Sequence, residues 1–323
     1  MRGLYFDKNL SFRSDLPLPV AEKGTSLVKI IKAGICNTDI EITKGYLGFD
    51  GVPGHEFVGI VEESSNRKLQ GKRVVGEINI PCGKCTYCRK ELGNHCSKRQ
   101  VLGIANKWGC FAEYITLPDE NLHLITNISD EEAVFVEPLA ACLEVLRQTV
   151  IKPNARVGII GDGKLGLLMA QVMLLKTKSV ILVGKHKVKL NVASKLGIST
   201  IDIAQAKPLQ SLKDKKLDVL IDCAGNTSGL EMAIELVKPR GVIVLKSTVA
   251  SSYNINLAPL VVNEVTVVGS RCGPFEDAIK ILAGKKVKIS HLISQVFPLS
   301  QGVKAIEAAK EKNVIKVLID VAK

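Results

Sequence analysis

Four cysteines lie within the sixteen residues PCGKCTYCRKELGNHC, with the spacing C-x2-C-x2-C-x7-C. Thiolates this close in sequence can converge on one tetrahedral ion, and zinc accepts four sulfur ligands at about 2.3 Å. A reducing cytosol makes a disulfide framework unlikely, and a redox pair would need only two of the four thiols. The spacing therefore predicts a structural zinc site formed by Cys82, Cys85, Cys88 and Cys96.

A second group of metal ligands is spread over the segments AGICNTDIEI, PGHEFVG and FVEPLA. Cys36 and His55 are residue types that zinc binds, and Glu56 and Glu137 add carboxylates. A catalytic zinc needs three protein ligands and one open position. Each residue alone has an ordinary explanation, since cysteines are often buried and Gly-His-Glu can form a turn. Together they predict a catalytic zinc in a cleft at a domain junction.

The segment GIIGDGKLGLLMA has the pattern of a dinucleotide-binding loop, because Gly161, Gly163 and Gly166 lie between an expected strand and an expected helix. The first glycine permits a tight turn, the second lets a pyrophosphate approach the backbone, and the third lets the helix pack closely on the strand. The free amides of the helix N-terminus attract phosphate. The loop, with Lys164 and Leu165, is therefore predicted to bind a dinucleotide.

The end of the next expected strand indicates which dinucleotide is bound. NAD-binding sheets usually carry an acid about 20 residues after the glycines, where it binds the adenosine ribose. Here the sequence is VGKHK, without a carboxylate and with two lysines and a histidine. These residues could pair with the extra phosphate of NADP, or the lysines could simply lie on the surface. The pattern favours NADP over NAD and selects Gly184, Lys185, His186 and Lys187.

Two further segments are expected near the cofactor. Cys223 and Ala224 close a later strand, although a turn at the edge of the core would read the same. Arg271 follows the last strand of the expected sheet, where it either approaches the nicotinamide end or caps the sheet.

The elements that must position these residues change character along the chain. Up to about residue 135, TSLVKIIKAGI, HEFVGIVEE, GKRVVGEI and GCFAEYITLP read as short strands bounded by glycine and proline. EEAVFVEPLAACLEVLRQTV has helical spacing. From ARVGIIG onward, apolar strands alternate with helices, which is typical of a parallel sheet covered on both faces. Two helices and a strand in VIKVLIDVA are expected at the C-terminal end.

Composition narrows the class of protein. The 323 residues are 46% hydrophobic and 24% charged, which predicts a globular protein of two domains. No signal peptide or membrane-length apolar run is evident, so we expect a cytoplasmic protein without a membrane partner. The net charge of +12 suggests nucleic acid, but the lysines are scattered and aromatic residues are only 4%. We expect a lysine-rich surface and no nucleic-acid partner.

The motifs GICNTD, GHE, the cysteine lobe, GCFAEY, VEPLA and GDGKLG follow one another in an order that resembles a known family. Over essentially its full length the chain is similar to the medium-chain dehydrogenase/reductase family, zinc-dependent alcohol dehydrogenase type. The resemblance implies an α/β protein with a mostly-β GroES-like catalytic domain (1–135) that contains the structural zinc lobe (82–96). A doubly wound Rossmann domain (136–272) and a segment completing the catalytic domain (273–323) follow.

The resemblance also implies roles for the second group of ligands. Cys36 and His55 would hold the catalytic zinc, with Glu56 and Glu137 as alternative third ligands. Thr38 matches the hydroxyl that relays the proton, and Asp39 matches the acid that orients a zinc-bound histidine. Many relatives carry a relay histidine where this chain has Glu41, so the outer end of the relay stays open.

The implied activity is hydride transfer between NADP and a secondary alcohol, polyol or sugar, or the corresponding carbonyl. The Glu137-Pro138 pair resembles the polyol, sugar and threonine dehydrogenases. Two alternatives are a zinc-independent quinone or enone reductase of the same fold and a non-catalytic protein that binds nucleic acid through its zinc lobe. Family membership suggests a homodimer or homotetramer joined through Rossmann sheets. The sequence leaves the substrate and the physiological direction open.

Overall fold

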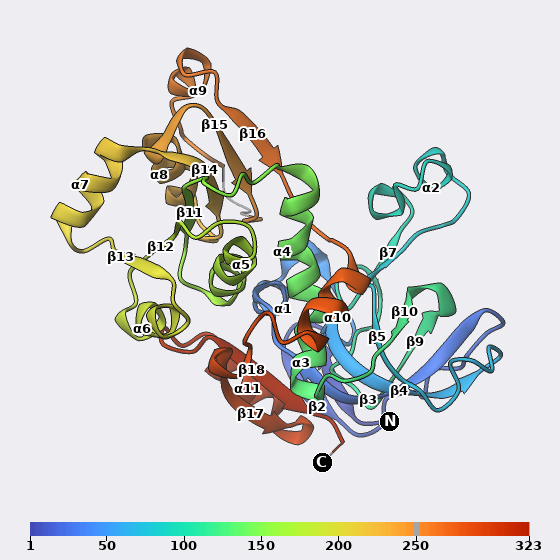
Figure 1. The fold of residues 1–323 in the computed structure, drawn as a ribbon. Coiled ribbons are helices and arrows are strands. Elements are labelled where there is room, and N and C mark those ends of the chain that lie inside the picture. Colours follow the sequence, from blue (N-terminus) through green and yellow to red (C-terminus); the bar gives the residue numbers. More distant parts are fainter. Residues whose placement is uncertain (249–251, 323) are drawn as a thin grey trace. The chain divides into compact units, whose positions relative to one another are not determined.

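The computed structural model describes residues 1–248 and 252–322, without the side chains of residues 206–209 and 215. The chain forms two compact units (Figure 1). Unit 1 contains Met1–Glu137, Phe275–Gly284 and Ile293–Lys323, and unit 2 contains Pro138–Pro274 and Lys285–Leu292. Within the described residues, no helix is both long and apolar enough to cross a membrane.

Unit 1 is built on a seven-stranded sheet in the order β10-β5-β4-β3-β18-β17, with β9 also paired to β3. Strand β3 is the centre of this sheet, and Leu27, Val28 and Ile30 are buried along it. The late strand β18 pairs antiparallel with β3, so that Leu318 lies opposite Gly34. The strands are β3 (Thr25–Gly34), β4 (Glu56–Ser64), β5 (Arg73–Gly76), β9 (Tyr114–Pro118), β10 (Leu122–Leu124), β17 (Ile293–Pro298) and β18 (Lys316–Asp320).

Smaller elements complete unit 1. Strands β1 (Gly3–Phe6) and β2 (Leu10–Arg13) form a hairpin, and β6 (Asn79–Ile80), β7 (Gln100–Leu102) and β8 (Asn106–Lys107) form a three-stranded sheet. The four-cysteine lobe leaves this small sheet and carries α2 (Thr86–Arg89) and η2 (Gly93–His95). The other helices are α1 (Asn37–Ile42), η1 (Tyr46–Gly48), η3 (Asp119–Asn121), α3 (Asp130–Val134), α10 (Phe275–Ala283), η5 (Leu299–Gln301) and α11 (Gly302–Ala308). Helix α4 (Val136–Gln148) begins in unit 1 and continues into unit 2.

Unit 2 is a parallel sheet of six strands in the order β13-β12-β11-β14-β15-β16. This is the doubly wound order, in which the first and fourth strands of the sheet, β11 and β14, lie at the centre and a crevice forms at their carboxyl ends. The strands are β11 (Val157–Ile160), β12 (Val180–Gly184), β13 (Ser199–Asp202), β14 (Leu217–Asp222), β15 (Val237–Leu245) and β16 (Thr266–Gly269). The helices are α5 (Lys164–Leu174), α6 (Lys187–Lys195), α7 (Ala206–Lys215), α8 (Ser228–Leu236), α9 (Ala258–Val262) and η4 (Ser290–Leu292).

The core of unit 2 explains why these segments read as continuous apolar runs. Leu217 and Leu220 on β14 pack with Ile243 on β15 and with Ala233 and Leu236 on α8, and all five are buried. A strand covered on both faces has no polar side to alternate with the apolar one. The predicted fold class, a mostly-β domain together with a doubly wound parallel sheet, is confirmed.

One predicted strand is shorter than expected. GCFAEYITLP was expected to be extended throughout, but β9 begins only at Tyr114. The preceding backbone bonds to a loop instead of to a neighbouring strand: Gly109 N–H donates to Val52 O (2.6 Å) and Phe111 N–H to Pro53 O (3.0 Å). This segment therefore supports the loop that leads into His55. The sequence analysis did not anticipate the β1–β2 hairpin, β13, α7 or β17.

Candidate metal centre and cofactor site

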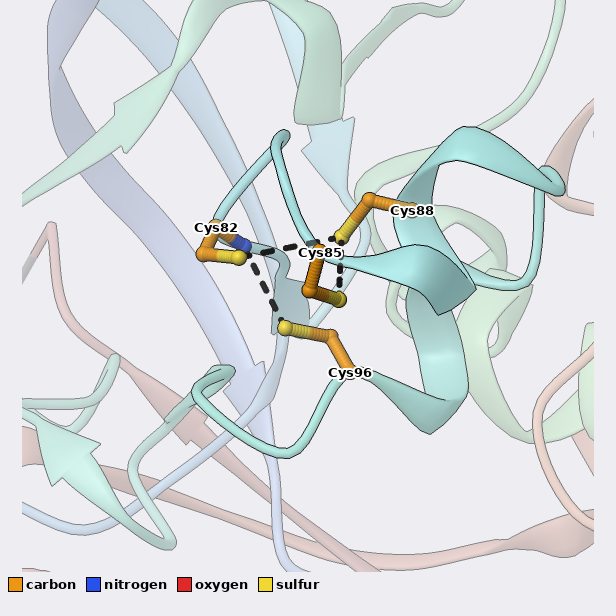
Figure 2. Close-up of side chains that lie close together, drawn as sticks. All are labelled: Cys82, Cys85, Cys88 and Cys96. Atoms are coloured by element: carbon orange, nitrogen blue, oxygen red, sulfur yellow. Dashed lines mark hydrogen bonds between the residues drawn. The ribbon is translucent and has the colours of Figure 1, made fainter.

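The four cysteines of the lobe converge on one point (Figure 2). Cys85 Sγ lies 3.4 Å and Cys82 Sγ 4.0 Å from Cys88 Sγ, while the backbone N–H of Cys82 donates to Cys96 Sγ at 3.5 Å. Four sulfurs bound tetrahedrally at about 2.3 Å are about 3.8 Å apart, whereas a disulfide joins its sulfurs at about 2.05 Å. The spacing fits a tetrahedral ion, and all nine cysteines are free thiols.

The lobe also promotes thiolate formation. A hydrogen bond from the backbone of Lys84 lowers the pKa of Cys82 to about 6. Desolvation and the neighbouring thiol of Cys85 raise the pKa of Cys88 to about 11. Cys82 therefore loses its proton easily whereas Cys88 holds its proton, so a divalent cation would be needed to collect four thiolates.

A second group of ligand atoms lies in unit 1, where β3 and β4 meet. Atoms of Cys36, His55 and Glu56 all lie within 4.8 Å of one another. Cys36 follows β3 and opens α1, His55 precedes β4, and Glu56 is its first residue. His55 and Glu56 are 3% and 1% exposed. This set of one sulfur, one imidazole and one carboxylate fits zinc. Glu137, the second residue of α4, is not among these three.

Asp39 joins the two sides of this group. Its Oδ2 accepts a hydrogen bond from the backbone N–H of Cys36 (2.7 Å), which fixes the start of α1. Its Oδ1 lies 3.1 Å from His55 Nδ1, at ion-pair distance although the angle is poor for a hydrogen bond. Burial alone would lower the pKa of His55, but the Asp39 carboxylate and Cys36 raise it well above the usual value. Asp39 thus holds the ring with its other nitrogen available to a metal.

Glu56 also forms a buried ion pair that the sequence analysis did not predict. Lys316, on β18, donates to Glu56 Oε2 and to the backbone carbonyl of Ile35 (3.1 Å). Both side chains of this ion pair are 1% exposed. The pair fits only because residue 34 is glycine, since a Cβ there would lie 2.7 Å from Glu56 Oε2 and 2.8 Å from Lys316 Cε. The Glu56 carboxylate is therefore held by a buried cation beside the metal ligands.

The predicted relay residues lie on α1. Thr38 Oγ1 is 3.9 Å from Cys36 Sγ, so its hydroxyl lies beside the ligand group. Glu41, five residues after Cys36, forms a largely exposed ion pair with Lys44 (2.9 Å). The loop that follows α1 exposes Tyr46 and Leu47 to solvent.

The glycine-rich loop of unit 2 has the geometry of a phosphate cradle. Gly161 has φ +109°, and a Cβ there would lie 2.6 Å from the carbonyl oxygen of Cys223. A Cβ on Gly166 would lie 1.9 Å from Gly161 O, so only glycine lets α5 start this close to β11. A Cβ on Gly163 would meet no atom within 4 Å. The open space at Gly163 and the uncapped amides at the start of α5 fit a pyrophosphate.

The turn after β12 binds a carboxylate from another segment of the chain, which the sequence analysis did not predict. Asp162, between the first two glycines of the loop, accepts hydrogen bonds from the backbone N–H groups of Lys185 (2.8 Å) and His186 (2.6 Å). Its other oxygen lies 2.8 Å from His186 Nδ1. A second acid, Asp202, closes β13 opposite Gly184 and accepts from Ala204 N–H (3.0 Å).

The remaining predicted cofactor residues lie at the carboxyl edge of the same sheet. Cys223 follows β14 and donates its N–H to Ile160 O (2.8 Å), and the adjoining Ala224 packs against Gly161. Arg271 is exposed, and its backbone carbonyl accepts a hydrogen bond from Lys246 (2.7 Å). Lys164 and Leu165 are half-buried in the first turn of α5.

Residues 22–127 match the family model described as alcohol dehydrogenase GroES-like domain, and residues 163–284 match the one described as zinc-binding dehydrogenase. A sorbitol dehydrogenase of Halalkalibacterium halodurans is 31% identical over 321 residues, which cover 94% of this chain and 93% of the relative. Two solved structures are each 27% identical with a TM-score of 0.92 and cover 99% of both chains. They are a zinc-binding dehydrogenase from Sinorhizobium meliloti 1021 bound to NADP and the short chain alcohol dehydrogenase rspB of E. coli CFT073 complexed with NADH.

These matches span both units and the motifs on which the resemblance rests. They confirm the GroES-like and Rossmann domains and the expected class of enzyme. The chain belongs to the medium-chain dehydrogenase/reductase family, zinc-dependent alcohol dehydrogenase type, and is an NAD(P)-dependent oxidoreductase.

Proposed function

We propose that this protein is a zinc-dependent polyol or sugar dehydrogenase that holds two zinc ions and prefers NADP. The observation that carries the proposal is the convergence of Cys36, His55 and Glu56 on one point, with Asp39 behind the imidazole. The four-cysteine lobe would hold the other ion as a structural brace. The sorbitol dehydrogenase among the relatives supports a polyol as the substrate class.

The chain's own residues would bind the reactant and move its proton. In the oxidative direction, a bound nicotinamide would accept a hydride from the carbinol carbon and the hydroxyl would lose a proton, so that the product would be a carbonyl. When bound, zinc supplies the Lewis acidity that lowers the cost of deprotonating an alcohol at neutral pH. Thr38, 3.9 Å from Cys36 Sγ, would accept that proton and pass it toward solvent. Asp39 keeps the His55 ring in its liganding orientation.

The third ligand remains a choice between Glu56 and Glu137. Glu56 lies in the ligand group, but its carboxylate is tied to Lys316. A carboxylate that already has a cationic partner would suit a ligand that binds the metal and leaves it again. Glu137 would bind the metal when Glu56 does not. Glu41 is paired with Lys44, so the outer relay would end at a surface ion pair instead of at a histidine.

The proposed preference for NADP rests on charge at the end of β12. Lys185 and Lys187 are exposed there, and Asp162 and Asp202 both accept hydrogen bonds from the protein's own backbone. A site with exposed cations favours the added phosphate of NADP.

We further propose a cytoplasmic homodimer. Reduced thiols in the zinc lobe suit a reducing compartment. The edge strand β16 and helix α9 expose Leu257 (54%), Val261 (77%), Val262 (80%) and Val267 (41%). Pairing of β16 with the same strand of a second copy would cover these side chains and satisfy the free edge of the sheet.

The test is nicotinamide absorbance during incubation of the zinc-loaded protein with alcohols, polyols, aldoses and threonine, each with NADP and with NAD. We expect turnover with a polyol and NADP that is lost in Cys36→Ala. Cys110→Ala is the matched control, because Cys110 is another thiol of unit 1, buried and 3.7 Å from Glu56 O, but is not one of the proposed ligands.

Turnover that survives Cys36→Ala would favour a zinc-independent reductase of the same fold. Silence in both directions with both cofactors, together with nucleic-acid affinity that falls steeply with salt, would favour the binding-protein alternative.

A further inference from the structure

The turn after β12 is held by a carboxylate from another part of the sheet. Asp162 lies in the loop after β11 and is 5% exposed. Its Oδ2 accepts from the backbone N–H groups of Lys185 and His186, and its Oδ1 contacts His186 Nδ1 at 2.8 Å. Burial alone would raise the pKa of Asp162, but these hydrogen bonds outweigh it and keep the pKa below the usual value. The carboxylate is therefore charged at neutral pH, and both oxygens are engaged by the turn.

Gly184 makes this arrangement possible. A Cβ on residue 184 would lie 2.5 Å from both Cβ and Oδ2 of Asp162, well inside van der Waals contact. Any other residue would displace the carboxylate. The glycine at the end of β12 thus creates the space that Asp162 fills.

His186 is oriented by the same contact. With Nδ1 facing Asp162, its Nε2 is the ring nitrogen left for a ligand, and no partner for Nε2 is found among the described residues. The side chain is 21% exposed at the N-terminus of α6. In a doubly wound sheet, the end of the second strand is where the adenosine ribose binds.

The surrounding charges decide which ribose substituent suits this turn. Lys185 and Lys187 are exposed on either side of His186, and Lys189, buried in the first turn of α6, interacts electrostatically with Asp162. Against these three lysines stand the carboxylates of Asp162 and Asp202, so the net charge around the turn is positive. A phosphate gains more from that environment than a hydroxyl does, because its hydrogen bonds to cations are charge-assisted.

We propose that Asp162 is a positioning residue for cofactor preference: it clamps the β12–α6 turn and orients His186 so that the turn binds the 2′-phosphate of NADP. The inference rests on the proposed function, since it deepens the choice of cofactor made there. Asp162 acts through His186 and the backbone of Lys185 without contacting the phosphate.

The test is calorimetric titration of the full-length protein with adenosine 2′,5′-bisphosphate and with 5′-AMP. The two fragments differ only in the 2′-phosphate and require neither substrate nor the catalytic metal. Wild type should bind the bisphosphate more tightly than 5′-AMP by roughly tenfold or more, as expected for a charge-assisted contact. His186→Ala and Asp162→Asn should each remove most of that advantage, while the affinity for 5′-AMP stays within about twofold. The double variant should lose no more than either single variant, because the two residues act as one unit.

Asp218→Asn is the matched control. Asp218 also accepts a backbone N–H, that of Arg156 (2.7 Å), but at the opposite end of the strands. It should leave the preference unchanged.

Additive losses from Asp162→Asn and His186→Ala, or a wild-type preference for 5′-AMP, would overturn the inference. An equal loss of affinity for both fragments in Asp162→Asn would show that Asp162 is merely structural, which also overturns it. If both fragments bind and the variants leave the preference intact, only the inference fails. If neither fragment binds wild type, the proposed dinucleotide function fails as well.

Discussion

Replacing Lys316 by methionine should strongly destabilise unit 1. Lys316 and Glu56 are each 1% exposed, and the lysine is the buried cation that offsets the Glu56 charge. Methionine keeps the unbranched shape but leaves a buried carboxylate without its partner. Removing one member of a buried ion pair typically costs about 3–5 kcal/mol, most of it from the charge left behind.

The unfolding of unit 1 can be followed separately because the only tryptophan, Trp108, lies in it. We expect urea unfolding of the zinc-free protein, read from Trp108 fluorescence, to shift to a lower midpoint by on the order of 1–2 M for Lys316→Met. Adding Glu56→Gln to that variant should recover most of the loss, because the second change removes the unpaired charge. The zinc-free protein is used so that a loss of metal affinity does not contribute.

Lys44→Met provides the control, since Lys44 also pairs with a glutamate but is 60% exposed. Exposed pairs contribute only about 0–1 kcal/mol, so this variant should unfold close to wild type. The reasoning is refuted if Lys316→Met unfolds no earlier than Lys44→Met. It is also refuted if the double variant is as unstable as Lys316→Met alone.

Three other predictions test the remaining sites. Gly163→Ala should unfold like wild type, because its Cβ would meet no atom within 4 Å, but calorimetry should show weaker NADP binding. Gly166→Ala should lose stability as well, because its Cβ would lie 1.9 Å from Gly161 O. Unchanged NADP affinity in Gly163→Ala would contradict the cradle. In the zinc-free protein, the alkylation rate of each cysteine can be mapped by mass spectrometry as a function of pH. The rate should rise around pH 6 for Cys82 and only far above neutrality for Cys88, because the reactive thiolate forms as the pH passes each pKa. Identical pH profiles for the two cysteines would contradict this prediction. Val262→Asp should convert the proposed dimer to a monomer in light scattering, and an unchanged mass would argue against the β16 interface.

The zinc lobe could be predicted from sequence because its information is local. All four cysteines lie within sixteen residues, and short loops leave few ways to arrange them other than around one ion. The glycine-rich loop was equally readable, since strand, turn and helix follow one another directly. The parallel sheet was recognisable because strands buried on both faces are apolar throughout.

The partners of the site residues were not readable, because they come from distant segments. Lys316 is 260 residues from Glu56, and periodicity cannot say which buried acid meets a lysine in an apolar strand. A lysine within VIKVLID was nevertheless a signal that some buried carboxylate should exist. The segment that follows β12 contains no acid, as its sequence shows. In the folded protein, however, the carboxylate of Asp162 reaches that turn from the loop after the neighbouring strand β11.

The position of β18 has a consequence for the order in which the enzyme is assembled during translation. In unit 1, β18 pairs with β3. Strand β3 is synthesised early and cannot form this pairing until β18 has been synthesised, nearly 300 residues later. At about 5–20 residues per second, the 260 residues between Glu56 and Lys316 take on the order of 10–50 s to emerge. During that interval unit 2 can fold, whereas Glu56 has no lysine to neutralise it. The metal-binding group would then be the last part of the enzyme to mature. A chain truncated before residue 316 would have a folded dinucleotide domain and an unfinished catalytic site.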